Sequence, residues 1–202
     1  MTWSRRRVLQ AGGALAGMSA AGLVGTAGLA GQARAQKAAA AGREAAGAGR
    51  DAATPRRIDL INLHTDERLG IEYFRDGGYL SGALTAIEGL LRDFRTGDRH
   101  AIDPKLMDYL VEVAHLLGVD PVFSVISGYR SPQTNARLRE RSTGVAQHSL
   151  HLEGRAIDVR LAGVDCAGLA ARALDLKRGG VGYYRASDFV HLDTGAFRTW
   201  KG

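Results

Sequence analysis

The sequence has very little cysteine, since Cys166 is the single one among 202 residues. One cysteine excludes an intrachain disulfide framework and any metal cluster held by cysteines alone. Aromatic residues make up only 6% of the chain and are not interleaved with basic segments, which argues against nucleic-acid binding. Charged residues (24%) and hydrophobic residues (45%) lie in the ordinary globular range, which excludes a chain that is disordered throughout.

The net charge of +6 is concentrated at the N-terminus. Residues 1–35 contain four arginines and no acidic residue, so residues 36–202 keep 23 basic and 21 acidic residues, a net charge of +2. The basic character therefore belongs to the N-terminal segment, and we expect no nucleic-acid partner.

The same segment has the parts of a bacterial export signal in order. Arginines at positions 5–7 precede an uncharged stretch, residues 11–31, and the sequence Ala33-Arg34-Ala35 then matches an A-x-A cleavage site. The arginine pair favours the twin-arginine route. We therefore expect residues 1–35 to be a cleaved signal peptide, with no stable membrane insertion afterwards. Retention of the segment as a membrane anchor is the alternative.

The remaining chain divides into a linker and one domain. Residues 36–56 are rich in alanine and glycine and lack a periodic apolar pattern, which predicts a flexible linker. We expect the folded domain to span residues 57–202.

Hydrophobic patterns predict a mixture of strands and helices in this domain. Alternation over residues 58–63 and 68–74 predicts a hairpin, and helical spacing predicts a helix over residues 80–94. Asp103 and Pro104 predict the start of a second helix that ends near residue 117. Further strands are expected at 121–126, 155–161, 181–184 and 189–192, and further helices at 133–141 and 165–176. No regular strand–helix alternation appears, so we predict an α+β fold with a largely antiparallel sheet and flanking helices.

Two histidines and one aspartate have the chemistry of a catalytic zinc site, which uses three protein ligands and leaves a fourth position for water. His151 and Asp158 lie in the segment SLHLEGRAID at 149–158, and His191 lies in DFVHLDTG at 188–195. Each residue taken singly is more often a surface, capping or structural residue. Their combination indicates the metal.

Side-chain alternation bears on whether these residues can meet. On one continuous strand, His151 and Asp158 would face opposite sides, but Gly154 supplies a break that lets His151 lie on a preceding loop. Asp158 then faces away from the apolar side of its strand. In the last predicted strand, His191 shares a face with Asp193.

These segments resemble a known family. The pattern S-x-H-x-x-G-x-A-x-D, followed by an acid-x-x-His, is similar to the zinc D-Ala-D-Ala peptidase and hedgehog-like fold group. Within that group the chain resembles the murein endopeptidase K family of exported cell-wall hydrolases. The likeness extends from Ile58 to Trp200 and includes the segments NLHT at 62–65, SGYRS at 127–131 and GGVGYY at 179–184.

The resemblance implies roles for individual residues. His151, Asp158 and His191 would be the ligands of Zn²⁺, which would activate water for attack on an amide carbonyl. Arg130, in SGYRS, would lie near the substrate carbonyl or carboxylate. Its fixed charge and forked donors suit an anion that develops in a tetrahedral transition state.

Two aspartates are candidates for the general base. The wider fold group has an acid three residues before the last histidine, which is Asp188 here, whereas strand alternation favours Asp193. Several relatives have glutamate in place of Asp188 and a tryptophan directly before the histidine, and this chain has neither. Asp193 is alternatively a partner that orients an imidazole. The sequence leaves these alternatives open.

The resemblance implies a periplasmic zinc metallopeptidase that hydrolyses peptide cross-links of peptidoglycan. Two alternatives remain at this stage. One is a D,D- or L,D-carboxypeptidase that trims stem peptides, in which Arg130 would clamp the terminal carboxylate. The other is a non-catalytic, zinc-containing module that binds the cell wall.

Overall fold

The computed structural model describes residues 54–141 and 146–202. The predicted signal peptide and nearly all of the predicted linker lie outside the described residues. Within the described part of the chain, no helix combines the length and the apolar character that a membrane span requires.

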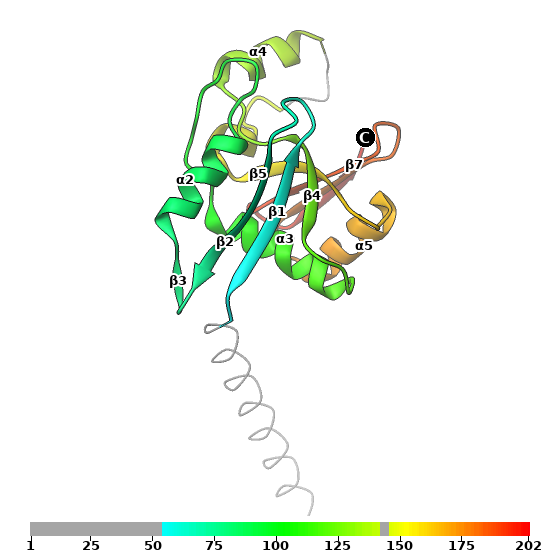
Figure 1. Cartoon of the computed structure of the whole chain (residues 1–202). Helices are drawn as coiled ribbons and strands as arrows, with labels where there is room; N and C mark the ends of the chain where they lie inside the picture. The colour runs from blue at the N-terminus through cyan, green and yellow to red at the C-terminus, as the bar shows by residue number, and fades with distance from the viewer. Residues whose placement is uncertain (1–53, 142–145) are drawn as a thin grey trace, which may run out of the picture. The chain divides into compact units, whose positions relative to one another are not determined.

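The described residues form one mixed sheet of eight strands in the order β3-β2-β1-β4-β5-β7-β6-β8 (Figure 1). The pairs β1–β4 and β6–β8 are parallel and the other neighbours are antiparallel. The strands are β1 (Arg56–Asn62), β2 (Arg68–Arg75), β3 (Gly78–Tyr79), β4 (Val122–Ser127), β5 (Ala156–Leu161), β6 (Gly180–Tyr184), β7 (Phe189–Asp193) and β8 (Arg198–Lys201).

Within the described ranges, four α-helices and one short 3₁₀ helix accompany the sheet. They are α2 (Ser81–Leu90), α3 (Pro104–Leu116), α4 (Pro132–Arg141), α5 (Cys166–Leu176) and the 3₁₀ helix η1 (Leu150–Glu153). The Asp103 carboxylate caps α3 by accepting a hydrogen bond from the Lys105 amide, and Pro104 occupies the first turn. The predicted α+β class with a largely antiparallel sheet is confirmed.

Helices α3 and α5 pack together against the sheet (Figure 1), and the Tyr109 hydroxyl on α3 donates a hydrogen bond of 3.0 Å to the Ala173 carbonyl on α5. The inward side chains of β5, Ile157 and Val159, are fully buried in this core. Alternation then turns Asp158 to the opposite side of the strand, as predicted. The polar site therefore lies on the side of the strands that faces away from these two helices.

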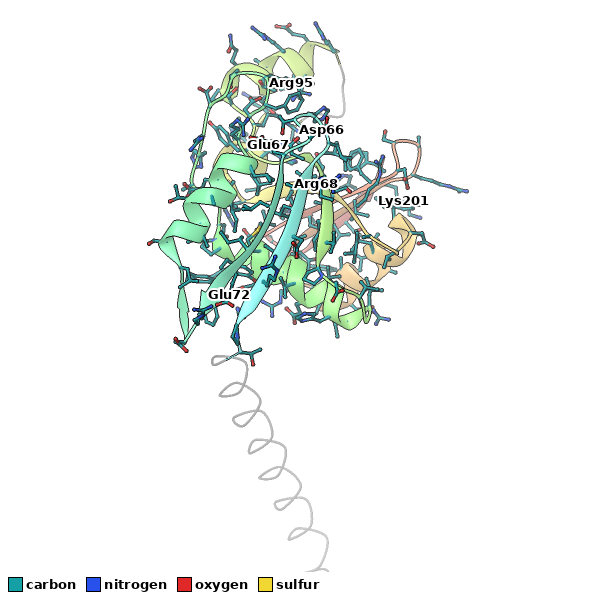
Figure 2. The ribbon with its side chains drawn as sticks, in the orientation of Figure 1. Asp66, Glu67, Arg68, Glu72, Arg95 and Lys201 are labelled. Atoms are coloured by element: carbon teal, nitrogen blue, oxygen red, sulfur yellow. The ribbon has the colours of Figure 1, made fainter. Side chains whose placement is uncertain are left out.

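Side chains connect the β1–β2 turn to the C-terminal end of α2 and to the segment that follows it. Figure 2 labels Glu67 at this turn. The Glu67 carboxylate, next to the β1–β2 turn, pairs with Arg92 after α2 at 2.8 Å. At the end of β1, the buried Asn62 side chain donates to the Leu90 carbonyl at 3.0 Å and accepts from the His64 amide at 2.9 Å. These contacts hold the segment that follows α2, which in turn supports the loop after β4.

The structure differs from the sequence prediction at the ends of two helices and in three additional elements. The helix expected over residues 80–94 ends at Leu90, because residues 93–97 form a turn in which the Arg95 amide donates to the Asp93 carboxylate. Helix α5 ends through Lys177 in a left-handed conformation (φ 52°), and not through the two following glycines. Strands β3 and β8 and the helix η1 were not predicted.

Candidate metal centre

Adjacent strands bring Asp158 and His191 together. Strand β5 pairs antiparallel with β7, and Asp158 lies directly opposite His191 in the register. Asp158 Oδ1 is 2.9 Å from His191 Nδ1. On the other neighbour of β5, the pairing shifts between Val125 and Ser127, the residue opposite Asp158. Such an irregularity in a sheet commonly re-aims a side chain next to a functional site.

The 3₁₀ helix η1 brings His151 to the same point. The Ser149 hydroxyl caps η1, and Gly154 ends it in a left-handed conformation (φ 65°). A Cβ atom at position 154 would lie 2.0 Å from the Ala101 carbonyl oxygen, so only glycine fits there. This turn places His151 Nε2 at 3.3 Å from Asp158 Oδ1 and 3.2 Å from His191 Nδ1.

The spacing of these three donor atoms suits one tetrahedral ion. Zinc–ligand bonds of about 2.0–2.1 Å imply donor–donor distances of about 3.3 Å in a tetrahedron. The observed separations are 2.9, 3.2 and 3.3 Å. Two imidazole nitrogens and one carboxylate oxygen are also the donor types that zinc accepts. The residues present therefore fit a zinc ion, with a fourth position left for water or substrate.

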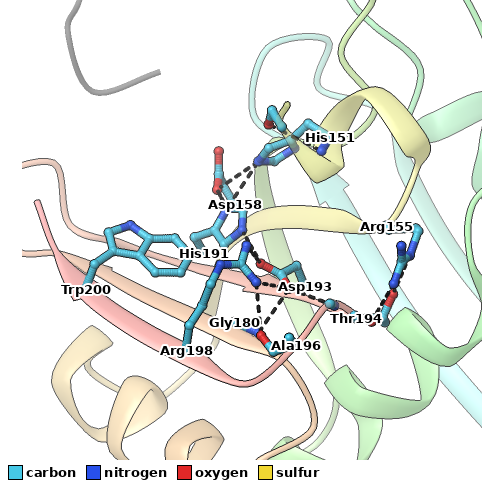
Figure 3. A network of polar contacts seen from close by, with 12 residues as sticks. His151, Arg155, Asp158, Gly180, His191, Asp193, Thr194, Ala196, Arg198 and Trp200 are labelled. Carbon is cyan, nitrogen blue, oxygen red and sulfur yellow. Dashed lines mark hydrogen bonds and ion pairs between the residues drawn. The ribbon is translucent and has the colours of Figure 1, made fainter. Parts of the chain in front are cut away.

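Hydrogen bonds at the outer ring nitrogens hold both imidazoles in place (Figure 3). His151 Nδ1 lies 2.7 Å from the Gly128 carbonyl oxygen, and His191 Nε2 lies 3.0 Å from Asp193 Oδ2. Each of these acceptors requires a proton on the outer nitrogen, which leaves His151 Nε2 and His191 Nδ1 free as metal donors.

Asp193 is completely buried and its carboxylate is saturated with donors. Oδ1 accepts from the amides of Gly180 at 3.0 Å and Gly195 at 2.8 Å, and Oδ2 accepts from Arg198 Nη2 at 2.7 Å as well as from His191 (Figure 3). Asp193 therefore has the geometry of an acceptor that orients His191, and its carboxylate is already occupied by four groups.

Burial and charged neighbours together shift the pKa values of the site in different directions. Burial alone would raise the pKa of Asp158, but His151 and His191 hold it well below its usual range. Burial lowers the pKa of His151. Burial also opposes charge on His191, but hydrogen bonds to Asp158 and Asp193 raise its pKa to about 8. Asp158 is therefore ionised at neutral pH, as a cation site requires.

Asp188 lies apart from this group. It occupies the turn between β6 and β7 in a left-handed conformation (φ 51°), and its side chain is 70% exposed. Its carboxylate pairs with Arg160 at 3.2 Å and also interacts with Cys166 at the start of α5. The turn geometry therefore directs Asp188 away from the cleft, and the structure does not bring it to the three donor atoms.

The three donor residues line a cleft of about 420 Å³. Arg130 lines the same cleft from the loop between β4 and α4, with Nη2 at 3.9 Å from Asp158 Oδ2 and Nη1 at 3.4 Å from Asn135 Oδ1. The Nε–H of Arg130 is buried without a hydrogen-bond partner among the described residues. Burial lowers the pKa of Arg130, although Asp158 opposes that shift. A buried cation with a free donor beside the metal position can bind an anionic group.

The loop that carries Arg130 is fixed from two sides. The buried Asp93 carboxylate accepts from the amide of Ser131 at 2.9 Å and from its hydroxyl at 2.7 Å. The Arg130 amide donates to the His151 carbonyl at 3.1 Å, while the Gly128 carbonyl accepts from the His151 ring. The SGYRS segment therefore positions the guanidinium and one imidazole together.

The sequence analysis missed part of the cleft. Tyr184, Phe189, Arg198 and Trp200 also line it, and none of them was a candidate. The signal that could have revealed these lining residues is the presence of Gly180 and Gly182 in the same strand region. Glycines that alternate in a strand indicate that another group approaches closely on that face.

Comparison with known proteins places this chain in a family. A family profile described as peptidoglycan L,D-endopeptidase MepK matches residues 50–200, which include all three donor residues. The chain belongs to this family. Relatives include peptidoglycan L,D-endopeptidase MepK of Escherichia coli (strain K12), 43% identical over 146 residues that cover 72% of this chain and 80% of the relative. The Haemophilus influenzae protein named probable peptidoglycan L,D-endopeptidase MepK is 43% identical over 149 residues, which cover 73% of this chain and 80% of that relative.

Membership of the MepK family confirms the resemblance to murein endopeptidase K that the sequence indicated. The matched region begins within the predicted linker and ends at Trp200, so it includes the three donor residues and β8 up to Trp200.

Substitution of the two candidate aspartates should give different results. Asp193→Asn should lower zinc affinity by roughly 10–100-fold, because it removes the charged acceptor that orients His191. Asp188→Asn is the matched control and should leave zinc affinity unchanged, since its carboxylate pairs with Arg160 outside the cleft. Competition with a chromophoric chelator measures both affinities. An Asp188→Asn protein that keeps its zinc but loses turnover would instead identify Asp188 as the base.

Proposed function

We propose that this protein is a zinc-dependent endopeptidase that hydrolyses peptide cross-links of peptidoglycan. The observation that carries the proposal is the set of three donor atoms at tetrahedral spacing, each imidazole oriented by a second hydrogen bond, at the base of a cleft that also holds Arg130. The names of the MepK relatives support an amide of the L,D type as the bond that is cleaved.

Each group in the cleft has a distinct part in this reaction. His151, Asp158 and His191 would hold the ion, and the single carboxylate leaves the site with a net charge of about +1. When bound, zinc polarises an amide carbonyl and acidifies water. Arg130 would stabilise the negative charge that develops on the carbonyl oxygen, because its partly unsatisfied guanidinium is already desolvated.

Proton transfer needs an acceptor that is not a ligand. Asp193 is occupied by four other groups, and Asp188 lies outside the cleft. Among the described residues that line the cleft, His148 is the imidazole outside the ligand set, and it is exposed. An imidazole nitrogen can both accept and donate a proton, as a general base or acid must. We therefore assign the proton transfer to His148.

The proposed function also requires export. Peptidoglycan lies outside the cytoplasmic membrane, so the enzyme would act in the periplasm. The leader-like residues 1–35, with their arginine pair, would direct the chain there by the twin-arginine route, and residues 36–56 would connect the leader to the catalytic domain.

Incubation of the purified chain with cross-linked muropeptides, with and without a chelator, tests the function. We expect dimers to become monomers, and we expect chelation to stop this conversion because the cleft then loses its electrophile. Mass spectrometry of the products identifies the cleaved bond. Loss of a terminal residue from monomers alone would indicate the carboxypeptidase, and zinc binding without any conversion would indicate the binding module.

Substitution of Arg130 tests its place in the reaction. Arg130→Ala should lower kcat by roughly 10²–10³-fold, the usual effect of removing one group that stabilises an oxyanion. Arg130→Lys should recover little, because lysine lacks the forked donors. Arg137→Ala, an exposed arginine on α4, is the control and should keep wild-type kinetics. If Arg130→Ala raised KM with kcat unchanged, the guanidinium would bind ground-state substrate only.

His148→Gln tests the assignment of proton transfer. We expect kcat to fall by roughly 10²–10⁴-fold while one equivalent of zinc remains bound, because the donor set is intact. His115→Gln, at an exposed position on α3, should not change the kinetics. Full activity of the His148→Gln protein would remove His148 from the mechanism.

A further inference from the structure

One row of residues crosses four strands at the metal centre. Asp158 on β5 lies opposite His191 on β7, His191 lies opposite Gly182 on β6, and Gly182 lies opposite Trp200 on β8. Side chains at directly opposed positions project from the same face of a sheet. Trp200 therefore belongs to the same row as two of the candidate ligands.

The glycine in this row lets the indole reach the histidine. A Cβ atom at position 182 would lie 2.5 Å from Trp200 Cε2, so any larger residue would displace the ring. With glycine there, the ring centroids of Trp200 and His191 are 5.1 Å apart at an angle of 53° (Figure 3). The indole thus forms a wall of the cleft directly beside a metal-binding imidazole.

Further contacts fix the orientation of this ring. The indole Nε1–H donates to the Tyr184 hydroxyl at 2.9 Å, and the Arg198 guanidinium lies 5.1 Å from the ring centroid. Tyr184 stacks on Phe189 at 4.5 Å. Trp200, Tyr184 and Phe189 therefore build an aromatic wall, whereas Arg130 and His148 supply polar groups to the same cleft.

We propose that Trp200 is a specificity-determining residue whose indole packs against the aliphatic side chain of the diamino acid next to the scissile amide. This inference rests on the proposed function, since the substrate is a peptidoglycan cross-link. Stem peptides offer few apolar groups besides alanine methyls and the methylene chain of diaminopimelate. A flat, pre-oriented indole suits such an unbranched chain, because it presents apolar area without losing side-chain freedom on binding.

Kinetics with two synthetic substrates test this contact. Both are L,D-linked peptide dimers, one with diaminopimelate at the junction and one with a diamino diacid that is one methylene shorter. Wild-type protein should prefer the longer side chain by roughly tenfold in kcat/KM, and Trp200→Ala should reduce that preference to less than about twofold. Trp200→Phe should retain part of the preference.

Measurement of zinc affinity, together with two further variants, distinguishes a substrate contact of Trp200 from a role in supporting His191. Trp200→Ala should bind zinc as tightly as wild type, since His191 keeps its hydrogen bond to Asp193. Phe197→Ala, an exposed aromatic residue directly before β8, should keep the wild-type preference. Gly182→Ala should lose the preference although it retains the indole, because the new methyl group displaces the ring. Zinc affinity that falls in parallel with activity, or an unchanged preference in Trp200→Ala, would overturn the proposal.

Fluorescence separates failure of this proposal from failure of the proposed function. Trp3 and Trp200 are the two tryptophans of the chain, so Trp3→Phe leaves Trp200 as the single reporter in the full-length protein. If neither dimer is cleaved, the proposed endopeptidase function is wrong, but binding of the dimer still tests the contact with Trp200. The Trp200 emission of the zinc-loaded protein should still change when the longer dimer is added. No emission change at a peptide concentration that saturates binding by calorimetry would overturn the contact with Trp200.

Discussion

The antiparallel pairing of β5 with β7 holds Asp158 opposite His191, and the rest of the site depends on this register. A slip of one residue would turn His191 into the core, because side chains alternate across a strand. The opposite faces of the same strands resist such a slip, since Ile157 and Val190 are fully buried there. The hydrophobic core beneath the sheet therefore also fixes the geometry of two of the proposed metal donors.

The groups around the three donor atoms are of two kinds: some orient the imidazole rings, and others are proposed to act on the substrate. Asp193 accepts hydrogen bonds from His191, Arg198 and two backbone amides, so its carboxylate holds the His191 ring in place and is already occupied by donors. The loop after β4 couples two functions, because its Gly128 carbonyl orients His151 while its next residues present Arg130. A shift of this loop would move His151 and the Arg130 guanidinium together, so the proposed ligand and the proposed oxyanion partner keep a fixed relation to one another.

The sequence predicted those features that depend on local patterns. Alternation placed Asp158 and His191 on the polar sides of their strands, and the glycine at 154 correctly indicated the turn that carries His151. The position of Asp188 could not be predicted, because it depends on a left-handed turn residue and not on strand alternation. The strand β8 was also missed, because its parallel pairing with β6 is non-local and its residues are mostly exposed. Trp200 and the aromatic wall were missed with it.

The central claim is that two imidazoles and one carboxylate, already arranged by the fold, bind a single zinc ion. X-ray absorption at the zinc edge of the full-length chain with one equivalent of metal tests it most directly. The account predicts a first shell of nitrogen and oxygen only, at about 2.0–2.1 Å, with the outer-ring scattering of two imidazoles. A sulfur scatterer at about 2.3 Å, which would place Cys166 on the metal, or a first shell without imidazole scattering, would contradict it.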